Sequence, residues 1–497
     1  MPMRSALVIG GGANGLACAF RLAKGGARVT LIEAADEIGG GARTMEFAPG
    51  FRTSGLAHLV HGLDARAAKE MGLEDHGFTA SAPLSTTLPG DTPITVSPRG
   101  EVTGTDSAAW DALHARLSRH AGRLAPFRTM RPPRLKGRQD WRKLAPTAFG
   151  LSRAGREDLR DLMRLALTNI ADVAEDELTD PRLQGLLAFD ATLGAWAGPR
   201  SPGTLLLYLN RLAMGDVRLP AGGMGALATA MARATEAAGV TIRTGTRAER
   251  LIVEEGRAVG ALLSSGEEVR AATIVSALCP QATLLQLAGA PALDTGIVRR
   301  ARNMPFRGAA AKIHLAIEGD PGLGDLTHRI VLAPSVDHVE RAFNPVKYGE
   351  VPAEPVLEIT CPSAHDPSLA PEGRHVLSII AQFAPHAPKD PAAAASAFKE
   401  AVWRVLEAAA PGLRSRTLHE ELLMPSDIEA RYGLKGGSWH HGDFAVERML
   451  FLRPFEEAAG YAAPLPGLWL ASAGSHPGGG VTGTAGWNAA EQVLRAA

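Results

Sequence analysis

Residues 6–15 read ALVIGGGANG, and this stretch decides the fold. A short apolar run leads into a glycine-rich turn that fits G-x-G-x-x-G, and residues 16–23 continue in a helical pattern. A second apolar run over residues 29–32 ends at Glu33. Strand, glycine turn, helix, strand and acid, in this order, are what the binding of a dinucleotide requires.

The positions within this unit have separate physical roles. Gly10 makes the tight turn, Gly12 lets the backbone approach a pyrophosphate, and Gly15 lets the helix pack close to the strand. The N–H groups that open the helix, around Ala13 and Asn14, face the phosphates. Glu33 lies 23 positions after Gly10, where its carboxylate accepts both ribose hydroxyls and disfavours a 2′-phosphate. The unit therefore argues against NADP.

The following residues favour FAD over NAD. Residues 34–44 read AADEIGGGART, which resembles the second half of the fingerprint of the FAD-binding superfamily that contains amine oxidases, carotenoid desaturases and Rab escort proteins. The resemblance implies cofactor contacts from Ala34, Gly40, Gly41, Ala42 and Arg43. Arg43 stands two positions later than the usual arginine of that fingerprint, so an arginine on the surface is the alternative reading.

The C-terminal segment supports a flavin independently. Residues 467–474 predict a turn and a buried strand, and residues 475–486, SHPGGGVTGTAG, open a final helix over 487–494. A glycine-rich helix start brings backbone N–H groups against a flavin ring, and its dipole stabilises negative charge on the reduced ring. The contacts expected here are Gly474, His476, Gly480, Val481 and Thr482.

Three further stretches resemble parts of the same superfamily. Residues 220–227 and the strands up to residue 277 resemble the returning half of its FAD domain. The resemblance places Arg247 and Ala248 near the adenine and Ser276 and Ala277 near the pyrophosphate. It also places Ser54, Gly55 and Leu56 under the isoalloxazine ring.

The chain resembles the phytoene desaturase-like branch, and within it the family of pyridine nucleotide-disulphide oxidoreductase domain-containing protein 2. Residues 39–51, 220–227, 436–443 and 476–481 carry that resemblance. It implies an α/β fold, with a Rossmann-like FAD-binding domain of the glutathione-reductase type and a second α+β domain built on a mixed sheet. We expect the FAD domain to comprise about 1–65, 215–300 and 455–497, and the substrate domain about 66–214 and 301–454.

Disulphide reduction is excluded in spite of that family name. The three cysteines, Cys18, Cys279 and Cys361, are far apart and form no C-x-x-C motif. No second G-x-G-x-x-G follows a strand and opens a helix, so a second nucleotide site for NAD(P)H is not expected. Electrons therefore enter from an organic substrate and leave to oxygen, a quinone or another acceptor.

Composition limits the other possibilities. The 497 residues carry a formal net charge of zero, which gives no indication of nucleic-acid binding. The low cysteine content indicates a reducing, cytoplasmic location, and no run of about 18 apolar residues predicts a membrane span. The first strand starts within a few residues of Met1, so we expect no cleaved targeting peptide.

One segment is strongly basic. Residues 116–164 carry fourteen Lys or Arg against four Asp or Glu, interleaved with apolar residues. Basic amphipathic segments bind anionic membranes, so peripheral contact with the inner face of a membrane is one expectation. A solvated helical face or a contact within a homodimer is the alternative.

His441 is the preferred polar residue for catalysis. It lies in residues 439–443, WHHGD, which the resemblance aligns with an H-G-D/E motif, and Asp443 is a candidate to orient it. His58 is a second catalytic candidate, although His58 and His61 could equally cap the following helix. His476 is interpreted either as lining the pocket or as supporting the glycine turn. No third ligand accompanies the paired histidines, so no metal is expected, and no residue requires a covalent flavin link.

The function expected from the resemblance is dehydrogenation of a largely apolar small molecule by hydride transfer to FAD. Amine oxidation by the same step, flavin-dependent isomerisation, and a non-catalytic escort or binding protein of the same fold remain alternatives. Fold alone does not choose the substrate.

Overall fold

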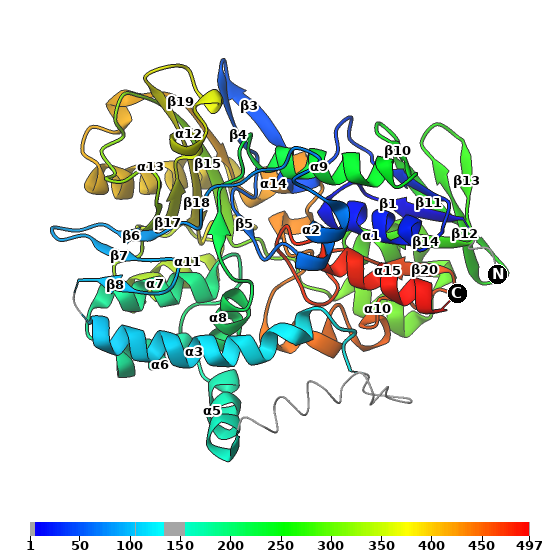
Figure 1. Cartoon of the computed structure of the whole chain (residues 1–497), viewed down its shortest axis with the longest axis horizontal. Helices are drawn as coiled ribbons and strands as arrows, with labels where there is room; N and C mark the ends of the chain where they lie inside the picture. The colour runs from blue at the N-terminus through cyan, green and yellow to red at the C-terminus, as the bar shows by residue number, and fades with distance from the viewer. Residues whose placement is uncertain (1–4, 105, 134–154, 497) are drawn as a thin grey trace.

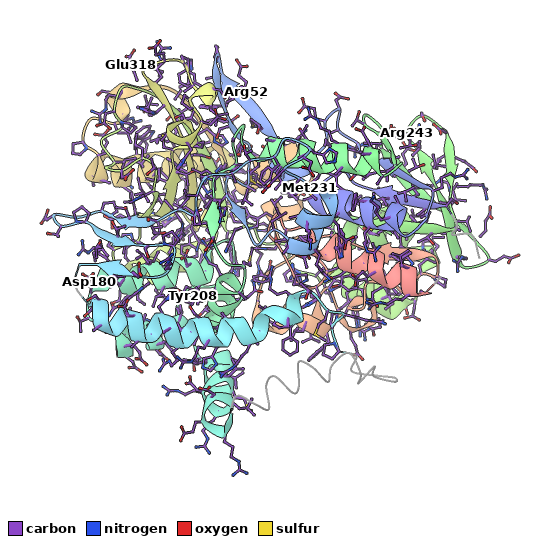
Figure 2. All side chains as sticks on the ribbon, viewed as in Figure 1. Arg52, Asp180, Tyr208, Met231, Arg243 and Glu318 are labelled. Carbon is purple, nitrogen blue, oxygen red and sulfur yellow. The ribbon has the colours of Figure 1, made fainter. Side chains whose placement is uncertain are left out.

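The computed structural model describes residues 5–104, 106–133 and 155–496. Figure 1 shows two bodies side by side, one around a parallel sheet near both chain termini and the other around a mixed sheet with a layer of helices beneath it. Tyr208 and Met231 lie in the interiors of these two bodies, whereas Arg243 and Glu318 lie at the periphery (Figure 2).

The first body is organised by a five-stranded parallel sheet in the order β10-β2-β1-β14-β20. β1 lies at its centre with every residue buried. Its residues alternate between two cores, because Ala6 and Val8 belong to one buried cluster and Leu7 and Ile9 to another. Both faces of the sheet are therefore covered, which is the usual condition of a parallel sheet. The strands are β1 (Ala6–Ile9), β2 (Val29–Ile32), β10 (Thr241–Arg243), β14 (Thr273–Ser276) and β20 (Leu468–Leu470).

Three helices cover one face of this sheet. They are α1 (Ala13–Lys24), α9 (Met224–Ala237) and α15 (Thr484–Ala496). The opposite face packs against a three-stranded antiparallel sheet and short helical segments. These elements are β11 (Ala248–Glu254), β12 (Arg257–Leu263), β13 (Glu268–Arg270), η2 (Ala282–Gly289), η3 (Ala290–Ala292) and α10 (Thr295–Arg302). The helices of the first face hold the glycine turn at the carboxyl end of β1.

The second body is built on an eight-stranded mixed sheet in the order β19-β15-β18-β17-β16-β6-β7-β8. All its pairs are antiparallel except β16 with β6. The strands are β6 (Thr86–Leu88), β7 (Ile94–Val96), β8 (Val102–Thr103), β15 (Ala310–Glu318), β16 (Arg329–Leu332), β17 (Val356–Thr360), β18 (Arg374–Gln382) and β19 (Thr417–Leu423).

Strand periodicity gives the two faces of this sheet different chemistry. Alternate residues of the three central strands, such as Ile313, Ile359 and Ile379, pack in one cluster with α13 (Pro391–Ala409). The residues between them point to the opposite face. They include Lys312 of β15 and Glu358 of β17, both buried. This second face is the one that faces the cavity described below.

Helices form the other layer of the second body and pack in one buried cluster with strands β6, β7 and β16. They are α3 (Ser107–Arg128), α5 (Gly155–Leu167), α6 (Ile170–Glu177), α7 (Pro181–Thr192), α8 (Thr204–Leu212) and α11 (Val336–Val346). In Figure 1, α5 projects from the rest of this layer. The remaining elements are β3 (Thr44–Ala48), β4 (Phe51–Ser54), β5 (Val60–His61), α2 (Ala65–Met71), β9 (Val217–Arg218), α12 (Pro362–His365) and α14 (Pro425–Tyr432).

The predicted fold class is confirmed: a parallel sheet with the dinucleotide-binding topology is joined to an α+β body on a mixed sheet. The strands at residues 6–9 and 29–32 have the predicted bounds. Residues 155–192 form three successive helices, because Asn169 and Asp180 begin new helices as N-caps. The boundaries of the two domains stay a prediction.

The basic segment 116–164 falls partly outside the described residues, because residues 134–154 are not described. Within the described part, Arg116 pairs with Glu177 and Arg123 with Asp158. These ion pairs neutralise part of the positive charge of the segment. Contact with a membrane stays a prediction. Across the described helices, none has the length and apolar character needed to cross a membrane.

Gly15→Ala tests the close packing of α1 on β1. A Cβ at Gly15 would lie 1.9 Å from the carbonyl oxygen of Gly10, so the helix would have to move. Such overpacking costs about 1–3 kcal/mol, although alanine is otherwise the better helix former. We expect a lower melting temperature in thermal unfolding. Gly12→Ala is the matched control, since its Cβ meets nothing within 4 Å; equal losses in both variants would contradict the packing argument.

Candidate functional site

One large cavity, about 660 Å³, lies between the glycine turn and the polar face of the mixed sheet. Its lining comes from both bodies: the turn after β1, the end of β2, helices α7 and α8, strands β17 and β18, and the loops around residues 433–444 and 479–481. This volume is typical of a site for a small molecule or cofactor.

The glycine turn forms one end of the cavity. Gly10 has a φ of 106°, a conformation that favours glycine. The N–H groups at the start of α1 open toward the cavity, and no atom lies within 4 Å of a Cβ built at Gly12. A phosphate can therefore approach this backbone closely and meet the positive end of the helix.

Glu33 lies beside this turn at the end of β2. Its Oε2 accepts a hydrogen bond from Gly11 N at 2.6 Å, and its Oε1 accepts one from Ala35 N at 2.9 Å. These bonds fix the carboxylate, which also lines the cavity. Each carboxylate oxygen has further acceptor capacity, so the fixed group can accept the hydroxyls of a ribose. The turn and Glu33 together fit a dinucleotide.

Most of the predicted cofactor contacts line this cavity. They are Gly10, Gly12, Ala13, Asn14, Gly15, Glu33, Ala34, Gly40, Gly41, Ala42, Arg43, Leu56, Arg247, Ala248, Ala277, Gly480 and Val481. Arg43 donates through Nε to Gly40 O, and its guanidinium lies over the ring of Tyr432. The aromatic contact gives Arg43 a role in packing within the cavity wall.

Six predicted contacts do not line the cavity: Ser54, Gly55, Ser276, Gly474, His476 and Thr482. The reason is that their atoms are used in internal packing. Ser54 Oγ accepts from Met224 N at 2.9 Å, and the hydroxyls of Ser276 and Thr283 share a hydrogen bond. His476 Nε2 bonds Phe127 O at 2.6 Å, so this histidine supports the loop instead of facing the pocket.

His441 lines the cavity, as predicted for a catalytic residue. Its Nδ1 is buried and has no hydrogen-bond partner among the described residues. Burial, and then the positive charge of Arg453, lower the pKa of His441 to about 4. The imidazole is therefore neutral near pH 7, and its Nδ1 keeps a hydrogen-bonding capacity that no described residue uses.

Asp443 does not orient His441 as expected. Arg307 takes both carboxylate oxygens: its backbone N donates to Oδ1 at 2.8 Å and its Nε donates to Oδ2 at 2.7 Å. Arg453 supports the histidine loop instead, because its guanidinium donates to the carbonyls of His440, Asp443 and Ala473. Arg453 is thus a buried cation held by backbone dipoles directly behind the cavity wall.

His58, the other catalytic candidate, also lines the cavity and is part of a buried polar network. Its Nε2 lies 2.9 Å from Glu358 Oε1, and its Nδ1 lies 2.9 Å from Lys312 Nζ. Burial and the charge of Lys312 lower the pKa of His58 to about 4. Burial also lowers the pKa of Lys312 well below its ordinary value, which favours the neutral amine. Neither His58 nor His61 caps α2, since Asp64 does so.

The network continues through charged residues that belong to none of the sequence motifs. Glu358 accepts from Arg329, Arg329 donates to Asp190 at 2.5 Å, and Arg211 Nε lies 3.1 Å from Asp190 Oδ1. Asp190, Arg211 and Glu358 line the cavity. A single charged residue in an apolar strand run, as at Glu358 and Lys312, is the sequence signal that would have found part of this network.

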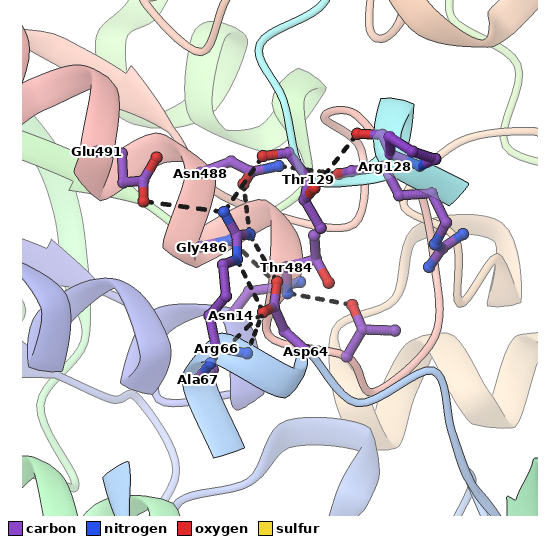
Figure 3. A network of polar contacts seen from close by, with 12 residues as sticks. Asn14, Asp64, Arg66, Ala67, Arg128, Thr129, Thr484, Gly486, Asn488 and Glu491 are labelled. Carbon is purple, nitrogen blue, oxygen red and sulfur yellow. Dashed lines mark hydrogen bonds and ion pairs between the residues drawn. The ribbon is translucent and has the colours of Figure 1, made fainter. Parts of the chain in front are cut away.

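A second polar cluster ties α2 and the end of α3 to the C-terminal helix α15 (Figure 3). Arg66 Nη2 donates to Asp64 Oδ2 at 2.7 Å and to Asn488 Oδ1 at 2.8 Å. Asn488 Nδ2 donates to Arg128 O at 3.0 Å, which fixes the end of α3 beside α15. The cluster therefore holds α2, α3 and α15 together.

The described residues contain neither a clustered set of metal-ligand side chains nor a pair of bonded cysteines. Among the described residues, no group of three or more His, Cys, Asp or Glu is placed to hold a metal ion. Cys18, Cys279 and Cys361 are free and buried, and burial raises the pKa of each thiol.

The neutral buried histidines predict a dependence of stability on pH. Burial lowers the pKa values of His58, His441 and His476 from 6.5 to about 4. Between these values the unfolded chain binds protons that the folded protein does not, so stability falls as pH decreases from about 6.5 to 4. His441→Asn removes one such group, and asparagine tolerates the positive φ at this position. The free energy of unfolding of this variant should fall less steeply with decreasing pH than that of the parent protein, by up to about 1.4 kcal/mol per pH unit.

Thermal or denaturant unfolding measured from pH 7.5 to pH 4.5 checks this expectation. His365→Asn, at an exposed histidine outside the cavity, is the control and should retain the parent slope. If His441→Asn shows the same slope as the parent, His441 does not enter the fold as a buried neutral group.

Comparison with known proteins identifies the relatives of this chain. The family model described as flavin containing amine oxidoreductase matches residues 14–494. Pyridine nucleotide-disulfide oxidoreductase domain-containing protein 2 of Rattus norvegicus is 30% identical, over 99% of this chain and 94% of that protein. The phytoene desaturase (neurosporene-forming) of Cereibacter sphaeroides is 27% identical, over 97% of this chain and 92% of that protein.

A solved structure is similar in fold. A putrescine oxidase variant, redesigned for cofactor binding, superposes with a TM-score of 0.65 at 14% identity, over 99% of this chain and 98% of that chain. At this identity the likeness concerns the fold alone. It agrees with the two-body architecture described above.

Proposed function

Because the chain belongs to the flavin-containing amine oxidoreductase family, we propose that this flavin-dependent oxidoreductase binds FAD and dehydrogenates a largely apolar small molecule. The observation that carries the proposal is the continuity of the cavity. One end has the phosphate-binding turn and Glu33, and the same cavity extends to His441 and to apolar side chains of the second body.

The residues of the first body are those that would hold the cofactor. The turn at residues 10–15 would receive the pyrophosphate, Glu33 a ribose, and the backbone at Arg247 and Ala248 the adenine. Bound FAD supplies a two-electron acceptor, which can take a hydride from a substrate C–H. The desaturase relatives support a substrate of apolar character.

The residues at the other end would bind and orient the substrate. Leu193, Leu207, Met214 and Ile380 line this part and exclude water. Desaturation removes a hydride from one carbon and a proton from its neighbour. His441 is the proposed base, because its neutral imidazole has a free Nδ1 in the cavity wall.

Amine oxidation is the less favoured reaction. Among the described residues, three with a Phe, Tyr or Trp side chain line the cavity: Tyr432, Trp439 and Phe444. Two of their rings are already covered by cations, since Arg43 lies over Tyr432 and Arg453 over Phe444. Such rings do not offer an open aromatic cage to a cationic amine.

Glu33→Gln tests the assignment of the cofactor end. Glutamine keeps the shape but loses the charge and one acceptor group, so we expect the affinity for FAD to fall by about tenfold or more. Titration of the apoprotein with FAD, followed by flavin fluorescence, measures this change. Glu37→Gln is the matched control, because Glu37 is exposed and lies outside the cavity. Unchanged affinity in Glu33→Gln would contradict the ribose assignment.

Anaerobic reduction tests the proposed reaction. Mixing the FAD-loaded protein with a panel of polyenes, terpenoids and primary amines should bleach the flavin absorbance with an apolar compound and give a product with one more double bond. Bleaching by primary amines alone would establish amine oxidation instead. Conversion of a substrate with no consumption of acceptor would indicate isomerisation.

A further inference from the structure

Arg128, the last residue of α3, is a buried cation without a carboxylate partner in the described structure. Its relative exposure is 9%. Nη1 donates to Asn210 Oδ1 at 2.6 Å, while the buried Nη2 has no hydrogen-bond partner among the described residues. An unsatisfied donor on a buried charge is costly unless a ligand satisfies it.

The carboxylate whose charge acts on Arg128 already accepts hydrogen bonds from other groups. Asp64 accepts from the backbone N–H groups of Arg66 and Ala67 and from the Arg66 guanidinium. In Figure 3, the guanidinium of Arg128 points away from the cluster that contains Asp64. Burial lowers the pKa of Arg128 to about 10, so it remains charged near pH 7.

The partner of Arg128 belongs to the cavity wall. Asn210 and Arg211 are neighbours on α8, and both line the cavity together with His61 and Met214. Arg128 and Arg211 both lie close enough to His61 to lower its pKa, after burial as the largest cause. Both guanidinium groups therefore lie near His61: Arg211 lines the cavity, whereas Arg128 does not line it and reaches the cavity wall through its hydrogen bond to Asn210.

The buried and partly buried charges at this end do not balance. Arg128, Arg211 and Arg329 contribute three positive charges, and Asp190 and Glu358 contribute two negative charges. The pKa of Lys312 is lowered, which favours its neutral form, and a charged Lys312 would only increase the excess. One further negative charge would neutralise this end of the cavity.

We propose that Arg128, with Asn210 and Arg211, forms an anion subsite that binds a carboxylate at one end of an otherwise apolar substrate. Guanidinium groups suit this role, since they donate several hydrogen bonds in the geometry of a carboxylate. The apolar residues that line the rest of the substrate end would hold the hydrocarbon part. This inference rests on the proposed function and refines its substrate class from apolar to amphipathic and anionic.

Equilibrium dialysis of the oxidised, FAD-loaded protein tests the subsite without any turnover. The probes are decanoate, 1-decanol and decylamine, which share one chain and differ in the head group. Decanoate should bind about tenfold or more tightly than 1-decanol, as expected for a buried, charge-assisted hydrogen bond. Decylamine should bind most weakly, because the excess charge repels it.

Arg128→Met keeps the length of the side chain and removes its charge, so it should abolish the preference for decanoate and leave 1-decanol binding unchanged. Arg123→Met is the matched control on the same helix, because the hydrogen-bond partners of Arg123, His120 and Asp158, do not line the cavity. Arg128→Lys, which keeps the charge, should retain part of the preference and serves if the methionine variant does not fold.

Two results would overturn the subsite. One is equal binding of decanoate and 1-decanol by the parent protein. The other is a preference for decanoate over 1-decanol that persists in Arg128→Met. If the flavin reduction potential changes in that variant while decanoate binding stays intact, the charge of Arg128 acts on the cofactor instead. Because dialysis needs no reaction, failure to reduce the flavin with any substrate would count against the proposed dehydrogenation and leave the subsite standing.

Discussion

The architecture depends on the close contact of three backbone segments at the carboxyl end of β1. A Cβ at Gly15 would lie 1.9 Å from Gly10 O, and one at Gly486 would lie 1.8 Å from Asn14 O. Glycine at both positions allows α1 to pack on β1 and α15 to pack on the start of α1. The two ends of the chain therefore meet at one turn, and the C-terminal loop at residues 479–481 reaches the cavity that this turn opens.

The second body contributes charged side chains to the surroundings of the cavity, whereas the first body contributes backbone groups. One face of its sheet is apolar and packs on α13, while the other carries Lys312 and Glu358 toward His58. Buried ion pairs of this kind contribute little net stability, because desolvation offsets their attraction. Their retention in a cavity wall is more readily understood as orientation of polar groups around a ligand. The excess of guanidinium over carboxylate groups then gives the proposed substrate end a positive charge as well as a shape.

The cofactor end could be predicted from sequence because its residues are close together along the chain. The glycine turn, Glu33 and the strand at residues 29–32 form one local unit with fixed spacing. The substrate end could not be predicted in the same way. Asp190, Arg211 and Glu358 come from three separate elements and meet only through tertiary packing. The expected role of Asp443 differs from the structure for the same reason, since Arg307, which binds it, lies 136 positions away.

The central claim is that the cavity holds FAD as a resident cofactor, and the absorption spectrum of the purified protein tests it most directly. A protein with bound FAD should show the two visible bands of an oxidised flavin. Chromatography after denaturation should release FAD and not FMN or a nicotinamide nucleotide. A colourless protein that takes up no added FAD would contradict the account, and would make a binding or escort role the better explanation of this fold.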